Sequence, residues 1–220
     1  MSVASDAWFA FMETAEGGLS LDPNDTGNYY KGNFIGSKLG LTGNDMATWL
    51  GRDPTRADME AITAATAKPI AMALYWQTMN CQAMQPSVGL MVCDFGYNTG
   101  IRRSGHVLQE LVGTDPDGWI GEATLAAIGA VDTIALAHKL SSGTLKVLQR
   151  RVHVEADGVI GPITLAAIAV ASDPKSIMLV GALTDAQADA YRTFKQFPRY
   201  GRGWLLRTAD RMIAAMKLIV

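Results

Sequence analysis

The sequence predicts a mainly α fold with one small β-hairpin. Apolar residues recur at helical spacing after residue 43, and prolines fall near the starts of these segments or between them. The Lys31-Gly32 pair, between Tyr29-Tyr30 and Phe34-Ile35, predicts the hairpin. With 49% hydrophobic and 18% charged residues, the 220-residue chain has the composition of a globular protein. The expected helices span about 6–16, 43–51, 56–64, 67–83, 86–96, 101–112, 121–129, 131–140, 143–151, 161–170, 173–180, 184–195 and 203–218.

The first expected helix ends in an unusual way. Ser5 or Asp6 can cap its start, and the Gly17-Gly18 pair should end it, because glycine loses much backbone entropy in a helix. Glu16 then lies on the last turn. The helix dipole disfavours a carboxylate there, and this local exception hints at a functional role.

Composition and charge restrict the partners. A net charge of −2 and a pI of about 5.9 leave no broad basic field for nucleic acid. No segment reaches the ~18–20 apolar residues of a membrane span, and no signal peptide is visible. We therefore expect no membrane insertion, and we expect synthesis as a soluble chain in the cytoplasm. We also expect the protein to be a monomer. Cys81 and Cys93 predict buried free thiols, and the histidines show no metal-ligand spacing, so we expect no metal and no other cofactor.

The second half contains an internal repeat. HVLQELVGTDPDGWIGEATLAAIGA (106–130) and KVLQRRVHVEADGVIGPITLAAIAV (146–170) align without gaps. Each copy predicts a helix, a D-G-x-I-G turn and a second helix. In the turns Asp117 and Asp157 can bond backbone amides, and the following glycines can take positive φ. Because one such unit cannot bury its apolar face alone, we expect the two copies to stack.

Carboxylates near the N-terminus suggest glycosidic bond cleavage. That reaction normally needs a carboxylic acid to protonate the leaving oxygen, and often a second carboxylate for the water or the cation. Glu16 is the candidate acid, and Asp25, nine residues on across a turn, is the candidate second group. Asp22 is a third candidate, although an aspartate before proline is often only a turn residue.

These residues resemble the start of a known enzyme family. The stretch Glu16-Gly17-Gly18-Leu19, followed by Asp22-Pro23-Asn24-Asp25 and Gly27, is similar to the glycoside hydrolase family 108 muramidases, whose pattern is E-G-G-Y-x-x-D-P-x-D-x-G-G-x-T. The resemblance implies a lysozyme-like helical bundle. It also implies that Glu16 is the catalytic acid and Asp25 the second acidic residue.

The chain departs from this pattern at three places. Leu19 replaces the aromatic residue, Asn28 replaces the second glycine, and Tyr29–Ile35 are inserted. When the pattern resumes, Ser37 stands at the position of the threonine of the family, and Thr42 is its possible substitute.

Further motifs extend the resemblance along the chain. They are Tyr75-Trp76, the D-F-G-Y-N-T-G stretch at 94–100, and the closing F-P-R-Y-G-R-G-W-L-L-R at 197–207. The resemblance makes Asp22, Tyr75, Asp94 and Asn98 candidates for substrate binding. Bland alternatives stay open: Asp94 can pair with an arginine, Asn98 can cap a helix, and the tyrosine can belong to the core.

The resemblance implies a peptidoglycan hydrolase that cleaves the β-1,4 bond between N-acetylmuramic acid and N-acetylglucosamine. It suggests a phage or prophage endolysin, released to the wall by a separate membrane protein. Residues 1–100 would form the catalytic region, and residues 101–220 a helical peptidoglycan-binding region. Two rivals remain, a lytic transglycosylase that uses Glu16 alone and a non-catalytic wall-binding protein.

Overall fold

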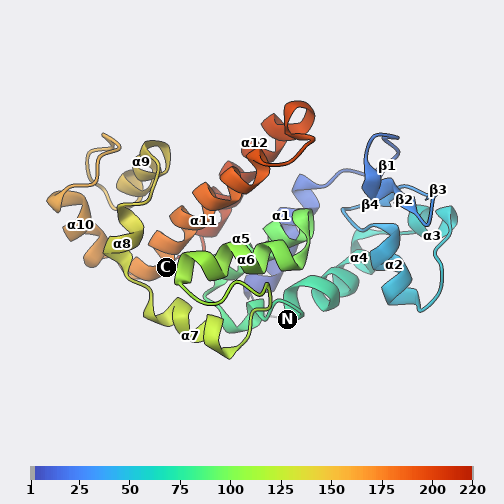
Figure 1. Ribbon diagram of the computed structural model, residues 1–220, viewed down its shortest axis with the longest axis horizontal. Helices are drawn as coiled ribbons and strands as arrows, with labels where there is room; N and C mark the ends of the chain where they lie inside the picture. Colours follow the sequence, from blue (N-terminus) through green and yellow to red (C-terminus); the bar gives the residue numbers. More distant parts are fainter. Residues whose placement is uncertain (1–2, 220) are drawn as a thin grey trace. The chain divides into compact units, whose positions relative to one another are not determined.

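The computed structural model describes residues 3–219, and its contacts divide the chain into two compact units, Met1–Thr78 and Met79–Val220. The prediction of a mainly α, lysozyme-like fold is confirmed, since helices dominate both units (Figure 1). The boundary proposed from motifs, at residue 100, falls after this division. Helix α5 (Pro86–Thr99) packs with helices of the second unit, although most of the D-F-G-Y-N-T-G motif that it carries was expected to belong to the catalytic region, residues 1–100.

In the first unit, threonine side chains define where three helices begin. Thr42, Thr55 and Thr63 form capping boxes at the starts of α2 (Gly43–Leu50), α3 (Arg56–Glu60) and α4 (Ala64–Ala71). The expected helix at 67–83 was wrong in its bounds. It begins earlier because Thr63 caps it, and after the internal Pro69 the chain widens into a π-helical turn, η2 (Met72–Gln77).

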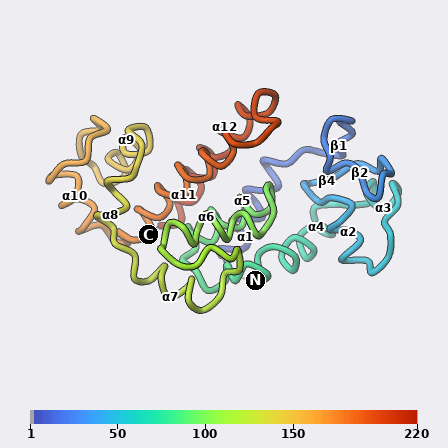
Figure 2. Tube along the Cα trace, viewed as in Figure 1, coloured from blue at the N-terminus to red at the C-terminus, as the bar shows by residue number. Residues whose placement is uncertain are grey.

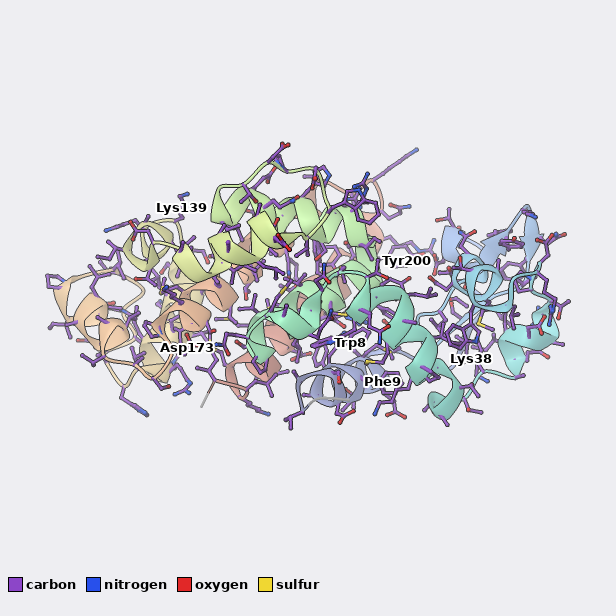
Figure 3. All side chains as sticks on the ribbon, turned by 90° about the horizontal axis from the view of Figure 1, so that it is seen from below. Trp8, Phe9, Lys38, Lys139, Asp173 and Tyr200 are labelled. Atoms are coloured by element: carbon purple, nitrogen blue, oxygen red, sulfur yellow. The ribbon has the colours of Figure 1, made fainter. Side chains whose placement is uncertain are left out.

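Helix α1 (Val3–Ala15) also begins earlier than expected. Ser5 and Asp6 lie within it, so the prediction that one of them caps the helix was wrong. Asp6 instead places a negative charge in the first turn, where the helix dipole favours it. Trp8 and Phe9 of this helix, labelled in Figure 3, are buried, and the Trp8 ring stacks on Trp76 with centroids 5.7 Å apart.

Two short antiparallel strand pairs lie between α1 and α2. The expected hairpin is confirmed as β2 (Tyr29–Tyr30) with β3 (Asn33–Phe34), and positive φ at Lys31 and Gly32 fits its tight turn. The prediction of a single hairpin missed a second pair, β1 (Leu19–Ser20) with β4 (Ser37–Lys38), whose strands precede and follow the hairpin along the chain. Strands β1, β2 and β4 are labelled in Figure 2. The 3₁₀ turn η1 (Thr26–Asn28) leads into the hairpin.

In the second unit, α5 and α6 (Ile101–Val112) pack with two long helices, α11 (Pro174–Arg192) and α12 (Phe197–Met216) (Figure 1). The sequence predicted two helices in place of α11. The prediction failed because a glycine such as Gly181 usually weakens a helix. Here the absence of a side chain at Gly181 lets α11 approach α9 (Ser142–Arg151), since a Cβ at this position would lie 2.9 Å from Leu148. Helix α12 begins at Phe197, and not near 203, because Pro198 is tolerated in its first turn.

The two sequence repeats fold alike. The first comprises the end of α6 and α7 (Glu122–Ala130), and the second comprises α9 and α10 (Pro162–Ala169). As expected, each D-G-x-I-G turn has a glycine with positive φ and an aspartate that accepts a backbone N–H. Both copies pack on α11, the first through α6 and the second through α9 and α10, and the expectation that they stack on each other stays a prediction. The short α8 (Thr133–Ala137) joins them and also packs on α11.

A buried ionic network joins α5 to α12. Asp94 is fully buried, and its oxygens accept hydrogen bonds from Arg207 Nη2 and Arg211 Nε, each at 2.7 Å. Burial disfavours the charged form of Asp94, but the two guanidinium groups outweigh burial and hold the pKa of this carboxyl below its ordinary value. The second unit thus has an ion pair in its core. Cys81, in the 3₁₀ turn η3 (Cys81–Ala83), and Cys93 are buried free thiols, as predicted.

Candidate active site

Glu16 directly follows the last residue of α1. Its backbone N–H donates to Met12 O at 2.8 Å, which continues the helical pattern by one bond and fixes the direction of the residue. The side chain is half-buried. Gly17 and Gly18 are exposed, and a Cβ at either position would meet nothing within 4 Å. The space that a side chain at Gly17 or Gly18 would fill is therefore open.

The β1–β4 pair brings Ser37 back to the segment that follows Glu16. Ser20 and Ser37 are register partners, so Ser37 pairs with a residue only four positions beyond Glu16. Ser37 is buried, with 9% of its surface exposed. The sequence identified Ser37 by its place in the family pattern, and the strand pairing supplies a physical reason for its position.

Asn28 organises the turn between β1 and β4, a role that was not predicted from the sequence. It is fully buried, and its side-chain amide donates to Ser20 Oγ at 3.1 Å and to Asp22 O at 3.0 Å. Its backbone oxygen accepts from Ile35 N and Gly36 N, each at 3.0 Å. A glycine, as in the family pattern, could not make the side-chain bonds. The replacement of the family's glycine by Asn28 was the only signal in the sequence for this role, because it places an amide side chain inside a turn.

The two aspartates of the turn have different local tasks. Asp22 Oδ1 accepts from the backbone and side-chain nitrogens of Asn24, each at 2.9 Å, which is the turn role that the sequence left open for it. Asp25 Oδ1 accepts from Gly27 N at 2.9 Å and caps η1, while its side chain is exposed to solvent. This bond orients the Asp25 carboxylate and leaves it accessible.

Thr42 and Tyr75 share a partner in the same unit. Thr42 Oγ1 and Tyr75 Oη donate to the two oxygens of Asp45, each at 2.7 Å. The Thr42 hydroxyl is thus part of a capping box, which makes Ser37 the better candidate for the family's threonine. The half-buried Tyr75 ties η2 to α2, and its role in substrate binding stays a prediction.

The remaining candidates, Asp94 and Asn98, lie on α5 in the second unit. Asp94 pairs with arginines, which was one of the two alternatives left open by the sequence. Its side chain is fully buried, and its carboxylate is bound by Arg207 and Arg211. Asn98 is exposed, and its amide donates to Asp94 O at 2.7 Å within the last turn of the helix. That bond leaves the amide oxygen of Asn98 for other contacts.

Gly36 controls how the strands come together, and its replacement gives a first prediction. Its φ is +82°, and a Cβ would lie 2.8 Å from Ser20 O. Gly32 has the same φ but an open surrounding. We expect Gly32→Ala to lower the free energy of unfolding of the first unit by about 1–2 kcal/mol through backbone strain alone. Gly36→Ala should cost about 1–3 kcal/mol more and should also reduce activity. Equal losses in urea unfolding would contradict this account of Gly36.

Within residues 3–219 no helix is long and apolar enough to span a bilayer, and no group of three or more His, Cys, Asp or Glu side chains is placed to hold a metal ion.

Comparison with known proteins assigns both parts of the chain. Residues 9–100 match the model of the family glycosyl hydrolase 108, and residues 143–209 match the model described as a predicted peptidoglycan domain. The structure is similar to that of SagA from Brucella abortus, with a TM-score of 0.69 and 22% identity over 98% of this chain and 94% of that chain. None of the curated proteins matches the chain. Residues 9–100 therefore form a glycosyl hydrolase 108 domain, and together with the peptidoglycan domain they support a glycoside hydrolase that acts on peptidoglycan.

Proposed function

We propose that the protein is an N-acetylmuramidase, which hydrolyses the β-1,4 bond between N-acetylmuramic acid and N-acetylglucosamine. The observation that carries the proposal is the placement of Glu16. Glu16 is half-buried, directly follows α1 and borders the open Gly17-Gly18 segment, within the part matched by the hydrolase family. A carboxyl on a partly buried residue of this kind can protonate the leaving oxygen of a bound glycan.

Asp25 and Ser37 complete the proposed site. Asp25 has an exposed carboxylate whose orientation is fixed by its bond to Gly27, which suits a group that orients water or stabilises an oxocarbenium-like transition state. Ser37 offers a hydroxyl from the strand paired with β1. In the proposed reaction Glu16 gives its proton to the departing sugar oxygen as the glycosidic C–O bond breaks. The water oxygen adds to the anomeric carbon, and the proton that the water loses passes to a carboxylate of the site, Glu16 or Asp25. No cofactor takes part in the reaction.

The proposal extends to the biological setting. A phage or prophage endolysin would be made in the host cytoplasm and would reach the wall after release by a separate membrane protein. The resemblance of the motifs to the family 108 muramidases is what suggests this setting.

The chemical ends of the products test the proposal. Wild-type protein is incubated with purified peptidoglycan, and the soluble fragments are analysed by mass spectrometry. We expect reducing N-acetylmuramic acid ends, and we expect Asp25→Asn to lower the rate of release by about 100-fold, within the usual range for acid–base groups. Anhydro ends, with little effect of Asp25→Asn, would indicate a lytic transglycosylase that uses Glu16 alone. An absence of fragments from folded protein would indicate a wall-binding protein without catalysis.

A further inference from the structure

The turn of the first repeat carries an exposed tryptophan. Trp119, in D-G-W-I-G, keeps 53% of its surface exposed. The guanidinium carbon of Arg102 lies 4.1 Å from the centroid of the indole, and Arg102 Nη1 donates to Asp117 O at 2.8 Å. Because the guanidinium covers one face of the ring, the exposed surface belongs to the other face and to the edges.

The backbone under this tryptophan is held firmly. Gln109 Oε1 accepts from Gly118 N at 2.7 Å, and Gln109 Nε2 donates to Asp117 Oδ1 at 2.8 Å. Asp117 Oδ1 also accepts from Trp119 N at 2.7 Å. A Cβ at Gly105 would lie 2.3 Å from Gly118 O, so the turn packs directly on the backbone of α6. An aromatic ring on such a support loses little conformational freedom when it binds a ligand.

The second repeat shows that the turn does not need the tryptophan. Gln149 makes the corresponding bonds, to Gly158 N at 2.8 Å and to Asp157 Oδ1 at 2.6 Å. At the same offset of 40 residues, however, Val159 stands at the position of Trp119, and Ser142, just before the aligned stretch, stands at the position of Arg102. Both members of the stacked pair are absent from the second copy, whose turn nevertheless keeps the bonds made by its glutamine and aspartate. Arg102 adds one bond to the first turn, but the indole ring of Trp119 makes no hydrogen bond that the turn needs.

We propose that Trp119, supported by Arg102, is a stacking platform for one sugar ring of a peptidoglycan glycan strand. The inference rests on one part of the proposed function, namely that the polymer on which the protein acts is peptidoglycan. An N-acetylhexosamine ring presents C–H groups on its flat faces, and a rigid indole with one open face offers the matching apolar surface. The chain's slight negative charge argues against a nucleic acid as the stacking partner. The platform lies between residues 9–100 and 143–209, so neither matched family model covers it.

Binding to a polymer that cannot be cut tests this platform. In full-length protein carrying Glu16→Gln, we compare Trp119→Val, which copies the residue of the second repeat, with Val159→Ala as the matched control. Co-sedimentation with insoluble peptidoglycan should show binding about tenfold weaker for Trp119→Val, equal to about 1.4 kcal/mol, and unchanged binding for Val159→Ala. Trp119→Tyr should retain most of the binding, because it keeps an aromatic face.

Three further results decide the matter. Thermal unfolding should be the same for Trp119→Val and its parent, as expected for an exposed residue. An N-acetylglucosamine tetramer should compete with peptidoglycan for the part of the binding that is lost in Trp119→Val. Competition by stem peptides alone would overturn the proposal. Equal binding of Trp119→Val and its parent would also overturn it. Release of fragments by Trp119→Val with Glu16 intact is measured in parallel. If release continues while the two proteins bind equally, the platform fails and the proposed function stands.

Discussion

Replacement of Asp94 by alanine is expected to destabilise the second unit by about 3–5 kcal/mol, the usual cost of breaking a buried ion pair. The change would leave the guanidinium groups of Arg211, fully buried, and Arg207, with 12% of its side chain exposed, without their carboxylate. The loss would spread further. Arg211 Nη1 donates to Gln187 Oε1 at 2.6 Å, and Gln187 Nε2 donates to Met91 O at 3.0 Å, so the network joins α12, α11 and α5.

Urea unfolding of the full chain, followed by circular dichroism, measures this effect. Asp189→Ala is the matched control in the same unit, since Asp189 pairs with Arg192 but both side chains are exposed. Its removal should change the free energy of unfolding by less than about 1 kcal/mol. A loss that small for Asp94→Ala as well would contradict the structural role assigned to the network.

Local signals predicted part of the fold. The helix that follows Thr42 and the hairpin turn at Lys31 and Gly32 depend on residues within a few positions, and both elements were found, although the equally local cap at Thr63 was missed. The β1–β4 pair could not be found in the same way. Each strand has only two residues, too few for an alternating pattern, and the contact joins segments that flank the whole hairpin.

The candidate site shows the same limit. Glu16 could be placed from sequence because a glycine pair follows it directly. The pairing of Asp94 with Arg207 stayed one of several alternatives, since 113 residues separate them and only the packing of α5 on α12 joins them. The role of Asn28 was missed because it depends on four hydrogen bonds, two from its side-chain amide and two to its backbone oxygen, inside a closed turn. No local sequence pattern indicates such a set of bonds.

Glu16→Gln is expected to have the largest effect on activity. Glutamine keeps nearly the same size and can keep hydrogen bonds, but it cannot give a proton to the leaving sugar oxygen. Loss of a general acid lowers a rate by about 10²–10⁴-fold, so we expect at least a 100-fold slower release of fragments. Glu13→Gln is the matched control, because Glu13 is an exposed carboxylate on the last turn of the same helix.

The role of Glu16 is tested by the rate at which soluble fragments are released from purified peptidoglycan, measured by mass spectrometry for wild type, Glu16→Gln and Glu13→Gln. We expect wild-type rates for Glu13→Gln and an almost complete loss for a folded Glu16→Gln. Release by Glu16→Gln within a few-fold of the wild-type rate would show that another group supplies the proton, and would contradict the assignment of Glu16 as the catalytic acid.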